Sequence, residues 1–111
     1  MPSARAQEVA EVLFELKRAS KIAAYTVVAR RAGFSPGSKG RTMMTTLAAV
    51  RRDWPHLQWW RALPDGFHVE RLSEQTEALR EAGFEIEDVD GKEDLVTIAG
   101  IEEHLMAWDE S

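Results

Sequence analysis

The sequence predicts a mainly α-helical fold with a small β-hairpin. Two observations favour this class. In the first half of the chain, apolar residues recur at three- and four-residue spacing, as they do along one face of a helix. In the second half, residues 84–87 alternate apolar and acidic side chains, and Asp90-Gly91 is a turn signal typical of a hairpin. The 111 residues, 44% of them hydrophobic, fit a single domain spanning 1–111.

The first half of the chain predicts three helices. The first begins at Ser3, a candidate N-cap, ends near Ser20 and has an apolar face made by Val9, Val12, Leu13 and Leu16. After a short link, a second helix is expected over 25–32, where Gly33 stops it. A turn over 34–38 leads to a third helix over about 39–52, whose inner side carries Met43, Leu47 and Val50. This order predicts a helix-turn-helix unit with the third helix as reader.

The second half of the chain is less regular. Residues 54–66 lack periodicity and are expected to form a long loop with a short extended piece. A helix is expected over 73–82, with Ser73 as its N-cap and Gly83 just past its end. The hairpin would pair residues 84–87 with a returning strand over 95–99, and a last short helix is expected over 101–108.

Charge is distributed unevenly along the chain, whose formal net charge is -5. Residues 1–60 contain ten Lys or Arg and four Asp or Glu, whereas residues 61–111 contain four and fifteen. This asymmetry is consistent with a basic half that faces DNA and an acidic half turned away from it. Ordinary solvated surface of uneven sign explains the same counts, and charge alone does not decide between the two.

The composition excludes several kinds of site. The chain has no cysteine, which excludes disulfides, thiolate metal sites and cysteine nucleophiles. No apolar run is long enough to span a bilayer and no signal peptide is apparent, so we expect a soluble, cytoplasmic protein without membrane contact. No cofactor or metal site is expected, because there is no glycine-rich phosphate loop and the histidines lack ligand spacing; these are His56, His68 and His104.

Several short motifs follow one another in an order that is specific when they are taken together. They are the segment 24–33 around Tyr25, Gly40-Arg41-Thr42-Met43, Trp59-Trp60-Arg61-Ala62 with Asp65-Gly66 after it, the series Gln75, Leu79 and Gly83, and Asp90-Gly91-Lys92-Glu93-Asp94-Leu95. Over about residues 6 to 100 this order resembles the DNA-binding domain of the methylated-DNA–protein-cysteine methyltransferases. The resemblance implies a winged helix-turn-helix of the alkyltransferase C-terminal domain type.

The reactive centre of that family is replaced in this chain. The family transfers an alkyl group to a cysteine thiolate that is activated by histidine, asparagine and glutamate. By the resemblance, Trp59 stands at the cysteine, Trp60 at the histidine, Trp54 at the asparagine and Ala82 at the glutamate. Alkyl transfer to cysteine is therefore excluded and no enzyme activity is expected. This pattern resembles the alkyltransferase-like proteins, which recognise damaged DNA without repairing it.

The resemblance also implies a DNA-binding site and a lesion pocket. Arg41 matches an arginine that enters the base stack, and Tyr25 matches a tyrosine that acts on the phosphate of the flipped nucleotide. Trp59 would wall the pocket, where stacking on an aromatic ring contributes about 1–3 kcal/mol per base. The expected DNA-binding residues are Tyr25, Arg41, Thr42, Thr45, Arg51 and Arg52, with further phosphate contacts from Arg30, Arg31 and Lys39. The expected pocket residues are Trp59, Arg61, Val69 and Arg71.

Each of these residues also has a purely structural interpretation. Tyr25 and the two tryptophans are of a type common in cores, and Arg41 is of a type common at solvated helix starts. If Trp59 and Trp60 lie in a strand, they face opposite sides, so one lines the pocket and the other packs in the core. Gln58 and Thr45-Thr46 depart from the family's proline and very small residues, which indicates a divergent branch.

The leading functional hypothesis is a monomeric, nucleoid-associated DNA-damage sensor. It would bind double-stranded DNA carrying alkylated guanine, flip that base and pass the site to nucleotide excision repair proteins, with the acidic second half as a candidate partner surface. The alternative is a winged-helix DNA- or protein-binding module, a regulator or an adaptor, that has lost base flipping.

Overall fold

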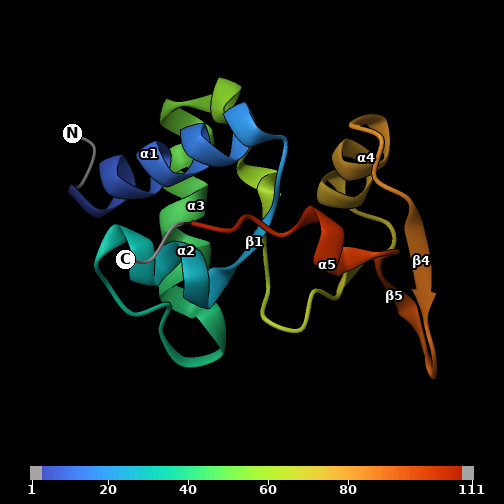
Figure 1. Ribbon diagram of the computed structural model, residues 1–111. Helices are drawn as coiled ribbons and strands as arrows, with labels where there is room; N and C mark the ends of the chain where they lie inside the picture. Colours follow the sequence, from blue (N-terminus) through green and yellow to red (C-terminus); the bar gives the residue numbers. More distant parts are fainter. Residues whose placement is uncertain (1–3, 109–111) are drawn as a thin grey trace.

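The computed structural model describes residues 4–108, which form a helical part and a part built on a small antiparallel sheet (Figure 1). The helices are α1 (Ala4–Ala19), α2 (Tyr25–Ala32), α3 (Arg41–Asp53), α4 (Glu74–Glu81) and α5 (Ile101–His104). The strands are β1 (Ala23–Ala24), β2 (Ala62–Leu63), β3 (Val69–Glu70), β4 (Ile86–Val89) and β5 (Lys92–Ile98). The 3-10 turns η1 (Ser38–Gly40), η2 (Pro55–Leu57) and η3 (Trp59–Arg61) lie before and after α3. The expected class, mainly α with a small hairpin, is confirmed, whereas the candidate N-cap Ser3 lies outside the described residues.

The first core forms where α1 packs against α2 and α3 (Figure 1). The faces predicted from helical spacing are the ones that are buried: Val9, Val12, Leu13 and Leu16 on α1, and Met43, Leu47 and Val50 on α3. Each fully buried aliphatic side chain of this kind stabilises the fold by about 1.5–3 kcal/mol. The core therefore fixes the orientation of α3 and leaves its opposite face to solvent.

The boundaries of α2 have a local cause at one end and a distant one at the other. The helix ends at Gly33, which adopts a φ of +92° and donates its backbone N–H to the carbonyl of Arg30 at 3.1 Å, as the sequence predicts. At the start, no side chain of the flanking residue caps the helix. Asp65 does so instead, accepting from the backbone N–H of Thr26 at 3.0 Å and from the Thr26 hydroxyl.

The predicted hairpin is confirmed, and a third strand joins it. β4 and β5 pair antiparallel around the predicted Asp90-Gly91 turn, with Ile86 opposite Ile98. β3 pairs with the other edge of β5, with Val69 opposite Val96, so the sheet order is β3-β5-β4. The sequence did not predict β3, because a two-residue strand has no alternation and forms only by pairing with a distant partner.

A second core lies between this sheet and α4. Its buried side chains are Ile22, Leu63, Val69, Leu79, Phe84, Val96 and Ile98. In Figure 1, α4 and the β4–β5 hairpin lie on the right and the bundle of α1, α2 and α3 on the left. The two-stranded parallel pair of β1 and β2 lies between them, with Ala23 opposite Ala62 and Ala24 opposite Leu63. The expected link over 22–24 is thus a strand that joins the two parts.

The last predicted helix is shorter than expected. α5 makes one turn and ends at His104, because Leu105 is extended and forms a parallel bridge with Ile22. The backbone N–H of Met106 donates to the carbonyl of Ile22 at 2.9 Å, and Trp108 donates its indole N–H to Glu15 at 2.8 Å. Residues 105–108 therefore lie back against α1 and against Ile22, the residue directly before β1.

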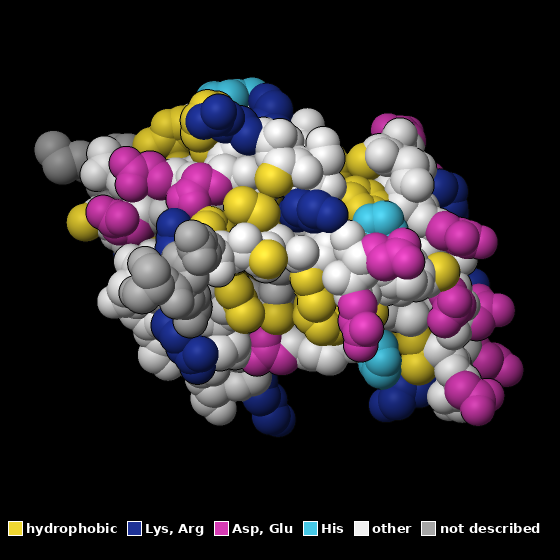
Figure 2. Space-filling model, viewed as in Figure 1, with side chains coloured by type: hydrophobic (Ala, Val, Ile, Leu, Met, Phe, Trp, Pro, Cys, Tyr) yellow, Lys and Arg dark blue, Asp and Glu magenta, His cyan; other side chains and the backbone are white. Residues whose placement is uncertain are grey.

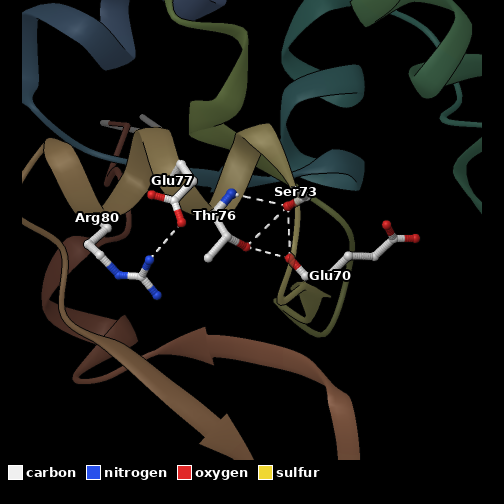
Figure 3. A network of polar contacts seen from close by, with 5 residues as sticks. All are labelled: Glu70, Ser73, Thr76, Glu77 and Arg80. Carbon is white, nitrogen blue, oxygen red and sulfur yellow. Dashed lines mark hydrogen bonds and ion pairs between the residues drawn. The ribbon is translucent and has the colours of Figure 1, made fainter.

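A network of short polar contacts fixes the start of α4 (Figure 3). The predicted N-cap Ser73 accepts from the backbone N–H of Thr76 at 3.2 Å and donates its hydroxyl to the carbonyl of Glu70 at 2.8 Å. The hydroxyl of Thr76 donates to the same carbonyl. One turn further, Arg80 pairs with Glu77 at 2.8 Å. The network ties β3 to the first turn of α4.

Candidate nucleic-acid interface

Tyr25 lies against the start of α3. A Cβ atom added to Gly40 would lie 3.0 Å from Cδ2 of the Tyr25 ring, and Gly40 has a φ of +73°. The ring therefore approaches the backbone directly before Arg41, and both the close approach and the positive φ favour glycine there. Burial raises the pKa of the Tyr25 hydroxyl, so the pKa lies even further above neutral pH than that of an ordinary tyrosine, and the neutral group can donate a hydrogen bond.

Arg41 is an exposed cation at the first position of α3. Within residues 4–108 its guanidinium has neither a hydrogen bond nor an ion pair, and the same holds for the exposed ammonium of Lys39. Thr45 donates its hydroxyl to the carbonyl of Arg41 at 3.1 Å and stays exposed. Two unpaired positive charges therefore flank Gly40, the residue that the Tyr25 ring approaches, and an anion can reach them from solvent.

The other threonines of α3 are less accessible. Thr42 is half-buried, and a Cβ on Gly37 would lie 2.4 Å from its Oγ1, so the turn before α3 packs on it. Thr46 is buried and donates to the carbonyl of Thr42 at 2.8 Å. Of the Thr45-Thr46 pair, only Thr45 adds bulk to the outer face of the helix.

Trp59 separates two hollows on the surface. The smaller one, about 270 Å³, is mostly apolar and is lined by Tyr25, Met44, Leu47, Ala48, Arg51 and Trp59. The larger one, about 470 Å³, is more polar; its lining includes Arg51, Trp59, Pro64, His68, Val69, Glu70, Glu74 and Gln75. We call them the apolar hollow and the polar groove. Three expected site residues, Tyr25, Arg51 and Trp59, thus surround the apolar hollow, and Val69 lies in the neighbouring groove.

Arg51 lies at the boundary between the two hollows. Its guanidinium carbon is 4.8 Å from the centroid of the Trp59 ring, a cation–π distance. The same guanidinium forms an ion pair with Glu74 of α4. Arg52, by contrast, pairs with its neighbour Asp53, and its Nε lies 3.1 Å from Oδ1 of that carboxylate. The hydrogen bond that Arg52 donates lowers the pKa of Asp53 below its usual range. Arg51 and Arg52, two of the residues expected to contact DNA, are therefore engaged with carboxylates.

Two residues expected in the lesion pocket lie elsewhere. Arg61 is 6% exposed and enters the core. Its Nε donates to Oε1 of Gln58 at 2.7 Å and its Nη1 to the carbonyl of Lys21 at 3.2 Å. The guanidinium carbon lies 4.7 Å from the centroid of the Trp60 ring. Burial lowers the pKa of Arg61 from its ordinary value.

Arg71 is the second expected pocket residue that lies away from Trp59. Its Nε donates to the carbonyl of Glu93 at 2.9 Å and its Nη2 to Oδ1 of Asp88 at 2.7 Å. These partners belong to the hairpin, and Arg71 therefore lines neither Trp59 hollow. The pairing of β3 with β5, which the sequence did not predict, is what turns Arg71 toward the hairpin.

The two adjacent tryptophans do face different surroundings, but not for the expected reason. Trp59 packs against the first core and Trp60 against the second. They lie in the 3-10 turn η3 rather than in a strand. Gln75 holds this segment, because its Nε2 donates to the carbonyls of Trp60 at 3.0 Å and Ala62 at 2.9 Å.

Sequence reasoning missed several lining residues of the apolar hollow. Met44, Ala48 and Arg51 recur at four- and three-residue spacing, which places them on one face of α3. Met44 is 57% exposed, which is unusual for a large apolar side chain. Helical spacing from Arg51 would have identified this face.

Charge is less clearly divided than the sequence suggests. Figure 2 shows Asp and Glu side chains over the C-terminal elements on the right and also over α1 on the left. Glu70 and Glu74 line the polar groove, whereas no carboxylate is found among the described residues that line the apolar hollow. Nη2 of Arg31 lies 3.5 Å from Oε2 of Glu15, and the guanidinium carbon of Arg31 lies 5.1 Å from the centroid of the Trp108 ring. Arg30 is exposed. The start of α3 is therefore the part of the expected interface best suited to phosphate.

Residues 4–108 contain no cluster of three or more His, Asp or Glu side chains that could hold a metal ion. None of the helices in this range combines the length and the apolar character that a membrane span requires.

Comparison of the chain with models of known protein families, with curated proteins and with solved structures finds no match.

Proposed function

We propose that the protein is a non-enzymatic DNA-damage sensor with a winged helix-turn-helix fold of the alkyltransferase type. The observation that carries this proposal is the arrangement at the start of α3. Arg41 is unpaired within the described residues, Tyr25 lies against the preceding residue Gly40, and Tyr25 also lines an apolar hollow walled by Trp59. One surface thus combines a cation, a neutral hydroxyl and an aromatic wall.

In this proposal each group has one role in base flipping. Extrusion of a nucleotide costs a few kcal/mol, and least where the base pair is already weakened by alkylation. Arg41 fills the gap in the stack while Tyr25 and Lys39 act on the adjacent phosphate. The flipped guanine stacks on Trp59 and enters the apolar hollow, whose volume of about 270 Å³ is slightly below the usual range of ligand pockets.

The chemistry that follows recognition is limited by the composition. The chain has no cysteine, so no thiolate can accept the alkyl group. We propose that the protein marks the lesion and that nucleotide excision repair proteins act on it. This handover, the monomeric state and a cytoplasmic, nucleoid-associated location rest on the resemblance to alkyltransferase-like proteins.

Fluorescence anisotropy with labelled duplexes tests the role of Arg41. Arg41→Ala should weaken binding to a duplex with one guanine methylated on its exocyclic oxygen by about tenfold, because both a charge and the inserted side chain are lost. Arg80→Ala is the matched control, since it removes one exposed arginine from α4. If Arg41→Ala and Arg80→Ala bind the damaged duplex equally well, the inserted-arginine role is wrong.

A second candidate function is favoured by the Arg51–Glu74 ion pair. The Glu74 carboxylate holds the Arg51 guanidinium over Trp59. The guanidinium therefore covers part of the ring on which a base would stack. If the pair persists on DNA, the protein is better described as a winged-helix regulator or adaptor without base flipping. Equal affinity for damaged and undamaged duplexes would support this alternative.

A further inference from the structure

A separate groove of about 710 Å³ lies between α1 and the segment that follows α3. Its apolar residues include Phe14 of α1, and Trp54 and Leu57 around η2. None of its lining residues belongs to the apolar hollow or the polar groove at Trp59. The groove can therefore be occupied while the Trp59 site is in use.

The aromatic side chains of the groove are more exposed to solvent than the side chains of the core. Phe14 is 49% exposed although it lies in the middle of a helix with a well-buried opposite face. Trp54 packs against the first core and still lines the groove. The Arg18 guanidinium carbon lies 5.8 Å from the centroid of the Phe14 ring, and two aromatic side chains lining one groove form an apolar patch of the kind that marks a binding surface.

One edge of the groove is acidic. Glu8, Glu11 and Glu15 lie at three- and four-residue spacing on α1, so they share one helix face. Glu15 accepts from the Trp108 indole and lies 3.5 Å from Arg31. Within residues 4–108, Glu8 and Glu11 have no cationic partner. Figure 2 shows the acidic side chains gathered over α1.

We infer that this groove docks a basic amphipathic segment of another protein. An apolar side chain of the segment would lie between Phe14 and Trp54, and its Lys or Arg residues would face Glu8 and Glu11. Charge complementarity favours a basic segment of a protein, because the carboxylates attract Lys and Arg side chains and repel the phosphates of nucleic acids and of anionic lipids. The inference is independent of the lesion-sensing function and places a partner surface on α1, outside the acidic second half of the chain.

The probe for this inference is a labelled synthetic helical peptide of leucine and lysine with one apolar stripe. It is titrated into the full chain by fluorescence anisotropy, and amide chemical-shift changes in the ¹⁵N-labelled chain locate the contact. We expect shifts along α1 and around Trp54. The double variant Glu8→Lys with Glu11→Lys should weaken binding by about tenfold, and so should Phe14→Ser.

Two matched variants separate a specific groove from general attraction. Glu102→Lys with Glu103→Lys makes the same change in net charge on α5, and Leu72→Ser removes another exposed apolar side chain, 92% exposed. Both should leave peptide affinity nearly unchanged. The inference is overturned if these controls weaken binding as much as the groove variants, if the shifts lie elsewhere, or if the peptide does not bind. It is also overturned if sedimentation shows a dimer that Phe14→Ser dissociates, because the occupant is then a second copy.

Discussion

Replacing Glu74 with glutamine should strengthen the binding of duplex DNA. Arg51 is held by Glu74 over the face of Trp59, at the boundary between the apolar hollow and the polar groove. Glutamine keeps the size of the side chain but removes the charge that competes with a phosphate. The released guanidinium becomes available to DNA, and one negative charge leaves the surface that DNA approaches.

The size of the effect follows from the exposure of the pair. The side chains of Arg51 and Glu74 are 46% and 73% exposed, so the pair contributes at most about 1 kcal/mol to folding and its loss is tolerated. One added phosphate contact should steepen the dependence of log affinity on log salt by about 0.9. A gain of about 1 kcal/mol in binding corresponds to about a fivefold gain in affinity at moderate salt.

The assay is a series of anisotropy titrations over a range of salt concentrations. Glu77→Gln is the matched control, because Glu77 lies in the same first turn of α4 and pairs with Arg80 in the same exposed manner. The control should change neither the affinity nor the salt dependence by a comparable amount. Equal slopes for Glu74→Gln and the parent chain would refute the idea that Arg51 is a masked phosphate contact.

Three further predictions concern the segment around the tryptophans. Gln75→Leu removes two hydrogen bonds to backbone carbonyls and should lower the free energy of unfolding by about 1–3 kcal/mol, measured by urea denaturation; an unchanged midpoint would contradict the holding role of Gln75. Gly40→Ala adds a Cβ 3.0 Å from the Tyr25 ring at a residue of positive φ, and should lower the free energy of unfolding by about 1–2 kcal/mol in the same assay. Gly91→Ala is the control for the positive φ alone, because its added Cβ would meet no atom within 4 Å. Equal losses of stability in the two variants would show that the contact with the Tyr25 ring does not matter. Trp59→Cys should not restore alkyl transfer, because the neighbouring Trp60 cannot act as a general base; label transferred from methylated DNA to that variant would show that the activating groups were misidentified.

The elements that could be predicted are those specified by nearby residues. Helical spacing identified the buried faces of α1 and α3, and local signals identified the Ser73 cap, the end of α2 at Gly33 and the Asp90-Gly91 hairpin turn. Elements that depend on distant pairing were missed. β3 exists because it pairs with β5, and the last helix ends early because Leu105 pairs with Ile22.

Some of the expected site residues come together in the structure, and others lie elsewhere because of contacts that the sequence does not show. Tyr25 and Trp59 come together because α2, α3 and η3 pack on one core, whereas the resemblance assigns Tyr25 to the phosphate and Trp59 to the pocket. The resemblance leads us to expect Arg61 and Arg71 in the pocket with Trp59. Arg61 instead enters the core in a 3-10 turn and Arg71 turns toward the hairpin, and neither geometry has a local sequence signal.

Lesion discrimination tests the proposed function most directly. The measured quantity is the ratio of affinities for two duplexes that differ only by one guanine methylated on its exocyclic oxygen, for the parent chain, Trp59→Phe and Trp59→Ala. The account predicts a ratio of at least about tenfold for the parent chain, retention of most of it in Trp59→Phe, and a ratio near one in Trp59→Ala, because stacking worth about 1–3 kcal/mol is lost. Equal affinity of the parent chain for both duplexes, or full discrimination by Trp59→Ala, would contradict it.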